Sequence, residues 1–168
     1  MAWAKNGTSV TVAGSATNIM TISDQTSTKF NVFLTHMIGV SGTSGIPSIR
    51  VGNGSVDTGA NYANRMSQDG GADGTWASET YIFGTYAGSS PYDNDKFQIV
   101  YGVNIGAEEK LFILFGVDFN AAGAGSAPSR QELVAKWANT SVQYDNMNNF
   151  VGTNGFGIGT NLTAIGTD

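Results

Sequence analysis

The chain contains no cysteine, and His36 is its single histidine. The absence of cysteine excludes disulfide bonds, thiol catalysis and thiolate metal sites, although it does not fix the cellular compartment. One histidine alone also supplies too few nitrogen ligands for a typical zinc site. Nucleophilic catalysis by a serine, histidine and aspartate triad would therefore have to use His36.

The pattern around His36 favours a structural role over a catalytic one. Residues 29–38 alternate as a β-strand would, and His36 shares one face with Val32 and Leu34. We expect this face to be buried, because it is apolar apart from the histidine. A hydrogen-bonded histidine in the core or at an interface is therefore favoured over a general base.

Charge is also scarce, and membrane and targeting patterns are absent. Charged residues make up 12% of the chain, about half the usual share, and its 23 glycines are about twice the average number. The eight basic residues are scattered and the net charge is −5, so nothing predicts nucleic-acid binding or a polybasic membrane patch. No stretch approaches the ~20 apolar residues of a membrane span, and the first residues show no signal-peptide pattern. We expect a soluble product made in a cytoplasm.

What the sequence does contain is β-strand alternation, most clearly in residues 96–119. Phe97, Tyr101 and Val103 occupy alternate positions before a short polar turn, and an apolar run from Leu111 to Phe115 follows the turn. This pattern predicts a long hairpin at the centre of an all-β domain.

Two of the predicted strands are apolar on both faces, and both faces therefore need cover. One face would meet the core, and the other would meet a loop, a short helix or a neighbouring subunit. We assign the second face to a subunit interface. Its residues are Phe33 and Met37 in the strand at 29–38, and Phe112 and Leu114 in the hairpin.

The whole chain predicts a single β-sandwich domain over residues 1–168. Nine or ten short strands follow one another at intervals of roughly 10 to 15 residues. Residues 130–140 suit a helix as well as a strand, and the surrounding strands favour a strand. We predict an antiparallel β-sandwich with jelly-roll topology.

Carboxylates in predicted turns are the candidates for metal binding or hydrolysis. Asp69, Asp73, Asp93 and Asp95 place oxygen ligands on short loops, which calcium accepts, although no loop has the EF-hand spacing. The alternative is that these residues cap turns. A glycosidase would need two carboxylates facing one sugar bond, and the sequence places no such pair. We therefore expect no catalytic residues and no cofactor, with calcium as an open alternative.

Aromatic residues near loops are candidates for sugar contacts, because a ring can stack on a pyranose face. Trp76, Tyr86 and Tyr92 are the candidates in this chain. Trp76 also falls on an alternating segment, so a place in the core is the alternative for that residue.

Several segments resemble a group of small phage virion structural proteins of jelly-roll type that are common in marine viral sequences. The segments are KFNVFLTH (29–36), NYANR (61–65) with Ser67, DGGAD (69–73), EKL (109–111), AGAGSAPSR (122–130), KWANTS (136–141) and GTNLTAIGTD (159–168). The resemblance spans most of the chain and includes no catalytic motif. It implies a β-sandwich virion protein.

The resemblance and the composition together lead to one expected function and two rivals. We expect a non-enzymatic capsid decoration or cement protein that binds between capsid subunits and stabilises the shell. It would be located in the virion, and its partners would be copies of itself in a homotrimer and the major capsid protein. One rival is a receptor-binding or fibre-head module that contacts host glycans, and the other is a tail-borne glycan hydrolase.

Overall fold

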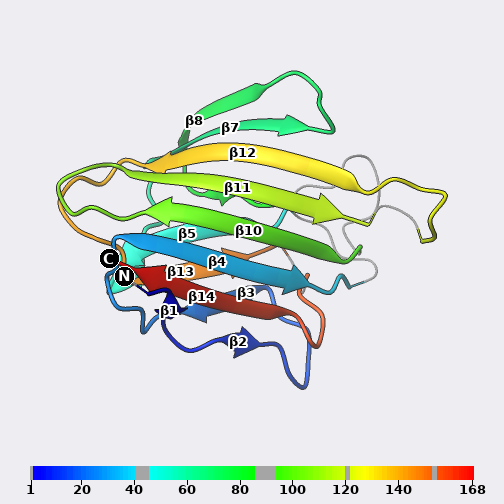
Figure 1. Ribbon diagram of the computed structural model, residues 1–168, viewed down its shortest axis with the longest axis horizontal. Helices are drawn as coiled ribbons and strands as arrows, with labels where there is room; N and C mark the ends of the chain where they lie inside the picture. The colour runs from blue at the N-terminus through cyan, green and yellow to red at the C-terminus, as the bar shows by residue number, and fades with distance from the viewer. Residues whose placement is uncertain (1, 41–45, 86–93, 120–121, 153–154) are drawn as a thin grey trace.

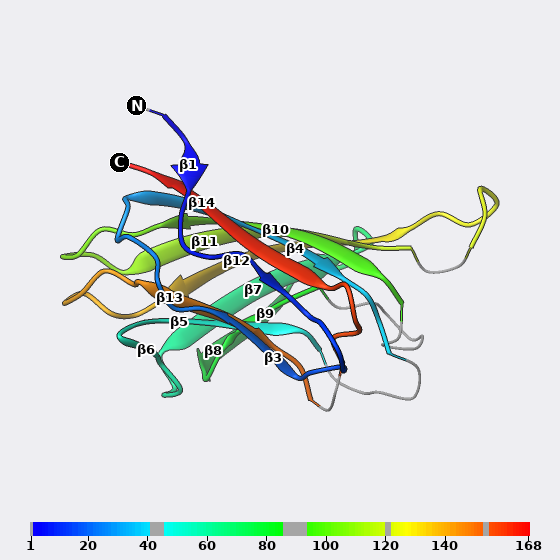
Figure 2. The same cartoon turned by 90° about the horizontal axis from the view of Figure 1, so that it is seen from below.

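The computed structural model describes residues 2–40, 46–85, 94–119, 122–152 and 155–168. Within these residues the chain is all-β, with fourteen strands and no helix. The strands form two antiparallel sheets that pack as two layers, as Figures 1 and 2 show from the front and from below. The predicted antiparallel β-sandwich is confirmed.

The larger sheet contains nine strands in the order β1-β14-β4-β10-β11-β12-β7-β8, with β2 also paired to β14. Their bounds are β1 Ala4–Lys5, β2 Val10–Thr11, β4 Phe30–Met37, β7 Tyr62–Gln68, β8 Gly74–Glu79, β10 Lys96–Val103, β11 Lys110–Asp118, β12 Ser129–Trp137 and β14 Asn161–Thr167. The predicted central hairpin is therefore β10–β11, and β12 confirms the strand expected within residues 130–140.

The smaller sheet contains five strands in the order β3-β13-β5-β6, with β9 also paired to β5. Their bounds are β3 Ile19–Ile22, β5 Ser48–Asn53, β6 Ser55–Val56, β9 Ile82–Phe83 and β13 Asn146–Phe150. In Figure 2 these strands lie beneath the larger sheet.

The strand pairing contains the eight-stranded jelly roll that the sequence predicts. In one layer β2 pairs with β14, β14 with β4, and β4 with β10; in the other β3 pairs with β13, β13 with β5, and β5 with β9. The strands β11, β12, β7 and β8 are added beyond β10. This addition widens one sheet only, and it places β11 near the middle of a broad surface (Figure 1).

The direction in which the β10 and β11 side chains point is fixed at Gly102 by the close approach of Tyr144, which lies in the segment just before β13. A Cβ atom on Gly102 would lie 2.5 Å from the Tyr144 hydroxyl oxygen and 3.0 Å from a ring carbon of Phe112. Position 102 must therefore face inward and remain glycine. Because side chains alternate along a strand, Tyr101 and Val103 must face outward.

This orientation corrects the predicted subunit interface. Phe33, Met37, Phe112 and Leu114 are all buried in the core between the two sheets. The rings of Phe33 and Phe112 pack against Tyr144, with centroids 6.1 and 5.8 Å apart. The strand is apolar on both faces as predicted, but the face assigned to a partner is the face that meets the core, and alternation alone cannot distinguish the two.

The same alternation corrects the expectation for His36, which is exposed. It lies on the outward side of β4, where its neighbours in register are Phe97 and Asn161. The inward side of β4 carries Asn31 and Thr35 as well as apolar residues, so the face expected to be buried was the wrong one.

Several polar side chains in the interior are hydrogen-bonded to one another. Gln98 of β10 donates from Nε2 to Asn149 Oδ1 of β13 at 3.2 Å, which joins the two sheets. Asn149 donates in turn to Thr35 Oγ1 at 2.8 Å, and the Thr85 backbone donates to Gln98 Oε1. Buried polar groups with such partners avoid most of the desolvation cost.

A buried ion pair joins the start of β10 to the end of β11, and it leads to a stability prediction. Lys96 Nζ lies 3.0 Å from Asp118 Oδ2, and both side chains are almost fully buried. We expect Asp118→Ala to lower the free energy of unfolding by about 3–5 kcal/mol, because an ammonium group would stay buried without its carboxylate. The double variant Lys96→Met/Asp118→Leu should lose much less, as measured by urea unfolding. Equal losses would contradict this assignment.

The carboxylate of Asp57 gives a pH prediction. Partial burial opposes its ionisation, but hydrogen bonds from the Trp137 indole, the Gly59 backbone and Asn61 outweigh burial and lower the pKa of Asp57. A lowered pKa in the folded state stabilises the protein above the unfolded pKa of about 4, and this stabilisation is lost as the pH falls through the folded pKa.

We therefore expect wild-type unfolding free energy to fall as the pH drops below about 5 and through the lowered folded-state pKa of Asp57, and to fall less steeply in Asp57→Asn. Urea unfolding at several pH values measures both slopes. An identical slope in the two proteins would show that Asp57 does not contribute.

Candidate functional site

The most unusual surface of the described chain is the outward side of β10, β11 and β12, which we call the outer face. Its exposed members on β10 and β11 are large apolar side chains at alternate positions, and β12 adds Val134 beside the charged residues Arg130, Glu132 and Lys136. The apolar members are Phe97, Tyr101, Leu111, Ile113, Phe115, Val117 and Val134, each between 37% and 56% exposed. Single exposed apolar residues are ordinary, but a contiguous group marks an interaction site.

Strand register makes the outer face contiguous. Tyr101 lies opposite Ile113, which lies opposite Val134, so one apolar row crosses three strands. Phe97 lies opposite Val117 in another row. Side chains directly opposite one another on neighbouring strands are about 5 Å apart at Cβ, which is within contact distance.

Charged residues border the outer face on the side of β12 and β7, and they are paired with one another. Arg130 lies 3.3 Å from Glu132, Lys136 lies 2.7 Å from Glu109, and Arg65 lies 3.2 Å from Asp73. Such exposed pairs contribute little to stability. Their arrangement leaves an uncharged centre with a polar rim, which is the usual anatomy of a protein interface.

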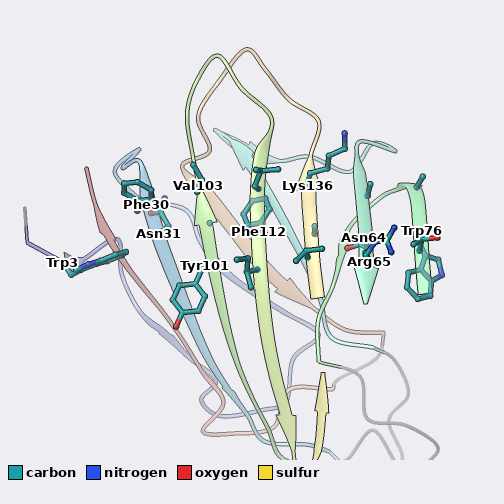
Figure 3. Close-up of a pocket in the computed structure, with 18 residues that line it drawn as sticks. Trp3, Phe30, Asn31, Asn64, Arg65, Trp76, Tyr101, Val103, Phe112 and Lys136 are labelled. Atoms are coloured by element: carbon teal, nitrogen blue, oxygen red, sulfur yellow. The ribbon is translucent and has the colours of Figure 1, made fainter. Parts of the chain in front are cut away.

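A groove of about 840 Å³ runs across the outer face. It extends from Trp3, beside β1, to Trp76 on β8, with Tyr101 between them, as Figure 3 shows. A second groove of about 300 Å³ shares Ile113 and Val134 with the first. The surface is therefore indented as well as apolar, and a partner could insert side chains into it.

The structure gives separate local partners to the predicted carboxylates. Asp69 accepts a hydrogen bond from the Arg130 backbone at 2.8 Å, and Asp95 accepts one from the Gly39 backbone at 3.2 Å. Asp73 pairs with Arg65. Asp93 lies outside the described residues. Within the described ranges, no three histidine or acidic side chains are grouped to hold a metal ion.

Of the predicted sugar-contact residues, only Trp76 lies among the described residues. Trp76 is half-buried, and its ring meets Phe83 edge-on at a centroid distance of 5.0 Å. Trp76 therefore packs against the core from the edge of the sheet, as its alternation allowed. Tyr86 and Tyr92 lie outside the described residues.

Sequence reasoning missed the residues that form the outer face. The signal was present, because Leu111, Ile113, Phe115 and Val117 were recognised as one apolar side of a strand with two apolar sides. The glycines at positions 102 and 116 on the opposite side could have identified that side as the inner one. In each case a Cβ atom would collide with a side chain of a neighbouring element.

Comparisons with known proteins add no assignment to this geometry. The chain matches no protein-family model, no curated protein and no solved structure. Among the described residues there is no helix long and apolar enough to cross a membrane.

Proposed function

We propose that this chain is a non-enzymatic structural protein of a phage virion, a capsid decoration protein that binds between capsid subunits and stabilises the shell. The single observation that carries an assembly role is the outer face, a contiguous apolar surface with paired charges at its rim. The resemblance to small phage structural proteins supplies the virion as the place of assembly.

The chemistry of the described carboxylates supports a binding role over hydrolysis. Asp69 and Asp95 accept hydrogen bonds from backbone amides, and Asp73 pairs with Arg65. A hydrolase would need carboxylates converging on one bond, whereas these groups hold local structure. The apolar surface is the feature left with no structural role in the isolated chain.

The alternative of a glycan-binding fibre head receives less support. A sugar platform needs an accessible aromatic face; the predicted residue Trp76 packs its ring against Phe83, and the exposed rings of Phe97, Tyr101 and Phe115 belong to the apolar outer face. The decoration role therefore stands first, and a glycan-binding result below would reverse this order.

Binding to purified capsid shells that lack this protein tests the proposal. We expect saturable co-sedimentation of the wild-type protein and a higher temperature of shell disruption. Ile113→Asp, which places a charge at the centre of the outer face, should weaken binding at least about tenfold, and such a loss corresponds to about 1.4 kcal/mol. Thr21→Asp, on an exposed position of the smaller sheet, controls for the added charge.

Failure of the wild-type protein to bind shells would overturn the decoration role. Retention on host polysaccharide without shell binding would favour the fibre-head alternative instead.

A further inference from the structure

We infer that the outer face is covered by the outer face of a second copy of this chain, related by a two-fold axis. This inference rests on the proposed function: the outer face would join two copies of the chain, and the dimer formed in this way would be the species that binds the shell. It differs from the homotrimer that is expected from the sequence. Three observations support it: the distribution of exposed apolar residues, the charge pattern and the area.

The distribution of apolar side chains favours contact between identical faces. The described residues contain eleven exposed large hydrophobic side chains, and only Ile19 and Ile158 lie away from the outer face and its borders. A contact between the outer face and a different surface of a neighbour would therefore oppose apolar and polar groups. An interface in which the same patch meets itself avoids this mismatch, and it closes as a dimer.

The smaller sheet does not offer an equivalent apolar surface. On its outward side Thr21 is exposed, and the guanidinium of Arg50 stacks over the Phe150 ring at 4.1 Å. This stacking occupies one ring face with a charged group. The outer face of the larger sheet has no counterpart of similar character elsewhere in the described chain.

The charge pattern is compatible with self-association. A patch with an excess of one charge would repel its own copy, whereas the charges around the outer face are paired within the chain. Each of the three rim pairs joins one basic and one acidic side chain. Two copies could therefore meet without burying an uncompensated charge at the rim, and the uncharged centre requires little desolvation of polar groups.

The area approaches what a stable pair needs. Strands are spaced about 4.8 Å apart and rise about 3.4 Å per residue, so the three strands of the outer face, at eight residues each, present a flat footprint of roughly 400 Å². The flanking strands, across which the groove extends to Trp3 and Trp76, enlarge the surface. A standard interface buries about 800 Å² on each partner, which is within reach of the enlarged face.

Mass measurement of the isolated protein by light scattering tests the inference without any shell. We expect a wild-type dimer at about 100 µM, as an affinity in the micromolar range requires. Ile113→Asp and Ile113→Lys should each be monomeric, while Thr21→Asp stays dimeric. Thermal unfolding should show that all variants fold, since position 113 is already exposed in the monomer.

Mixing the two Ile113 variants distinguishes identical from different contact surfaces. If the outer face meets its own copy, opposite charges are brought together, and the equimolar mixture should dimerise at least about tenfold more tightly than either variant alone. A wild-type protein that is a monomer would overturn the inference. So would an oligomer that Ile113→Asp leaves intact, or a wild-type trimer that does not form again when the two Ile113 variants are mixed.

These outcomes are separable from failure of the proposed function. A wild-type monomer that still binds shells would remove the second copy and keep the decoration role. A dimer disrupted by Ile113→Asp that binds no shell would keep the second copy and remove the decoration role.

Discussion

The constraint on which the structure depends is the close approach of Tyr144, in the segment just before β13, to the β10–β11 hairpin. Tyr144 leaves no room for a side chain at position 102, so this glycine must face inward. Because side chains alternate along a strand and paired residues share a face, this one position fixes the orientation of both strands. Phe112 and Leu114 point into the core, and Tyr101 and Ile113 point to solvent. The apolar outer face is a consequence of this choice, and the wide sheet added beyond the jelly roll gives the face its breadth.

The distribution of polarity is unusual for a monomer and suits a subunit. The interior contains hydrogen-bonded Gln98, Thr35 and Asn149, together with the Lys96–Asp118 ion pair, whereas aromatic and aliphatic side chains face water. The exposed groups would gain about 25 cal/mol for each Å² of apolar surface covered by a partner. Part of that gain would offset the loss of rotational and translational freedom on association. The isolated chain thus folds around one layer of contacts, and in the proposed function the outer face supplies a second.

Much of the fold was predictable from the sequence, but the orientation of its strands was not. Alternation identified the hairpin at 96–119, and turn residues with regular spacing identified the sandwich. The strand within residues 130–140 was favoured by its context. Alternation states which residues share a face without stating which face is inside, so Phe112 was assigned to a partner although it is buried, and the face of His36 was expected to be buried although His36 is exposed. The glycines at positions 102 and 116 are a local hint to the inner side, but deciding required the long-range information that Tyr144 and Thr85 approach them.

Adjacent residues of β11 provide the most direct measurement of the central claim. Urea unfolding should be compared for wild type, Phe112→Ser and Ile113→Ser at a dilution where the protein is monomeric. The structure predicts that Phe112→Ser loses about 3–5 kcal/mol of unfolding free energy, because it leaves a cavity in the core. Ile113→Ser should change unfolding by less than about 1 kcal/mol, because its side chain is already half in water. The reverse order, or equal losses, would show that the outer face is not directed to solvent and would contradict the account.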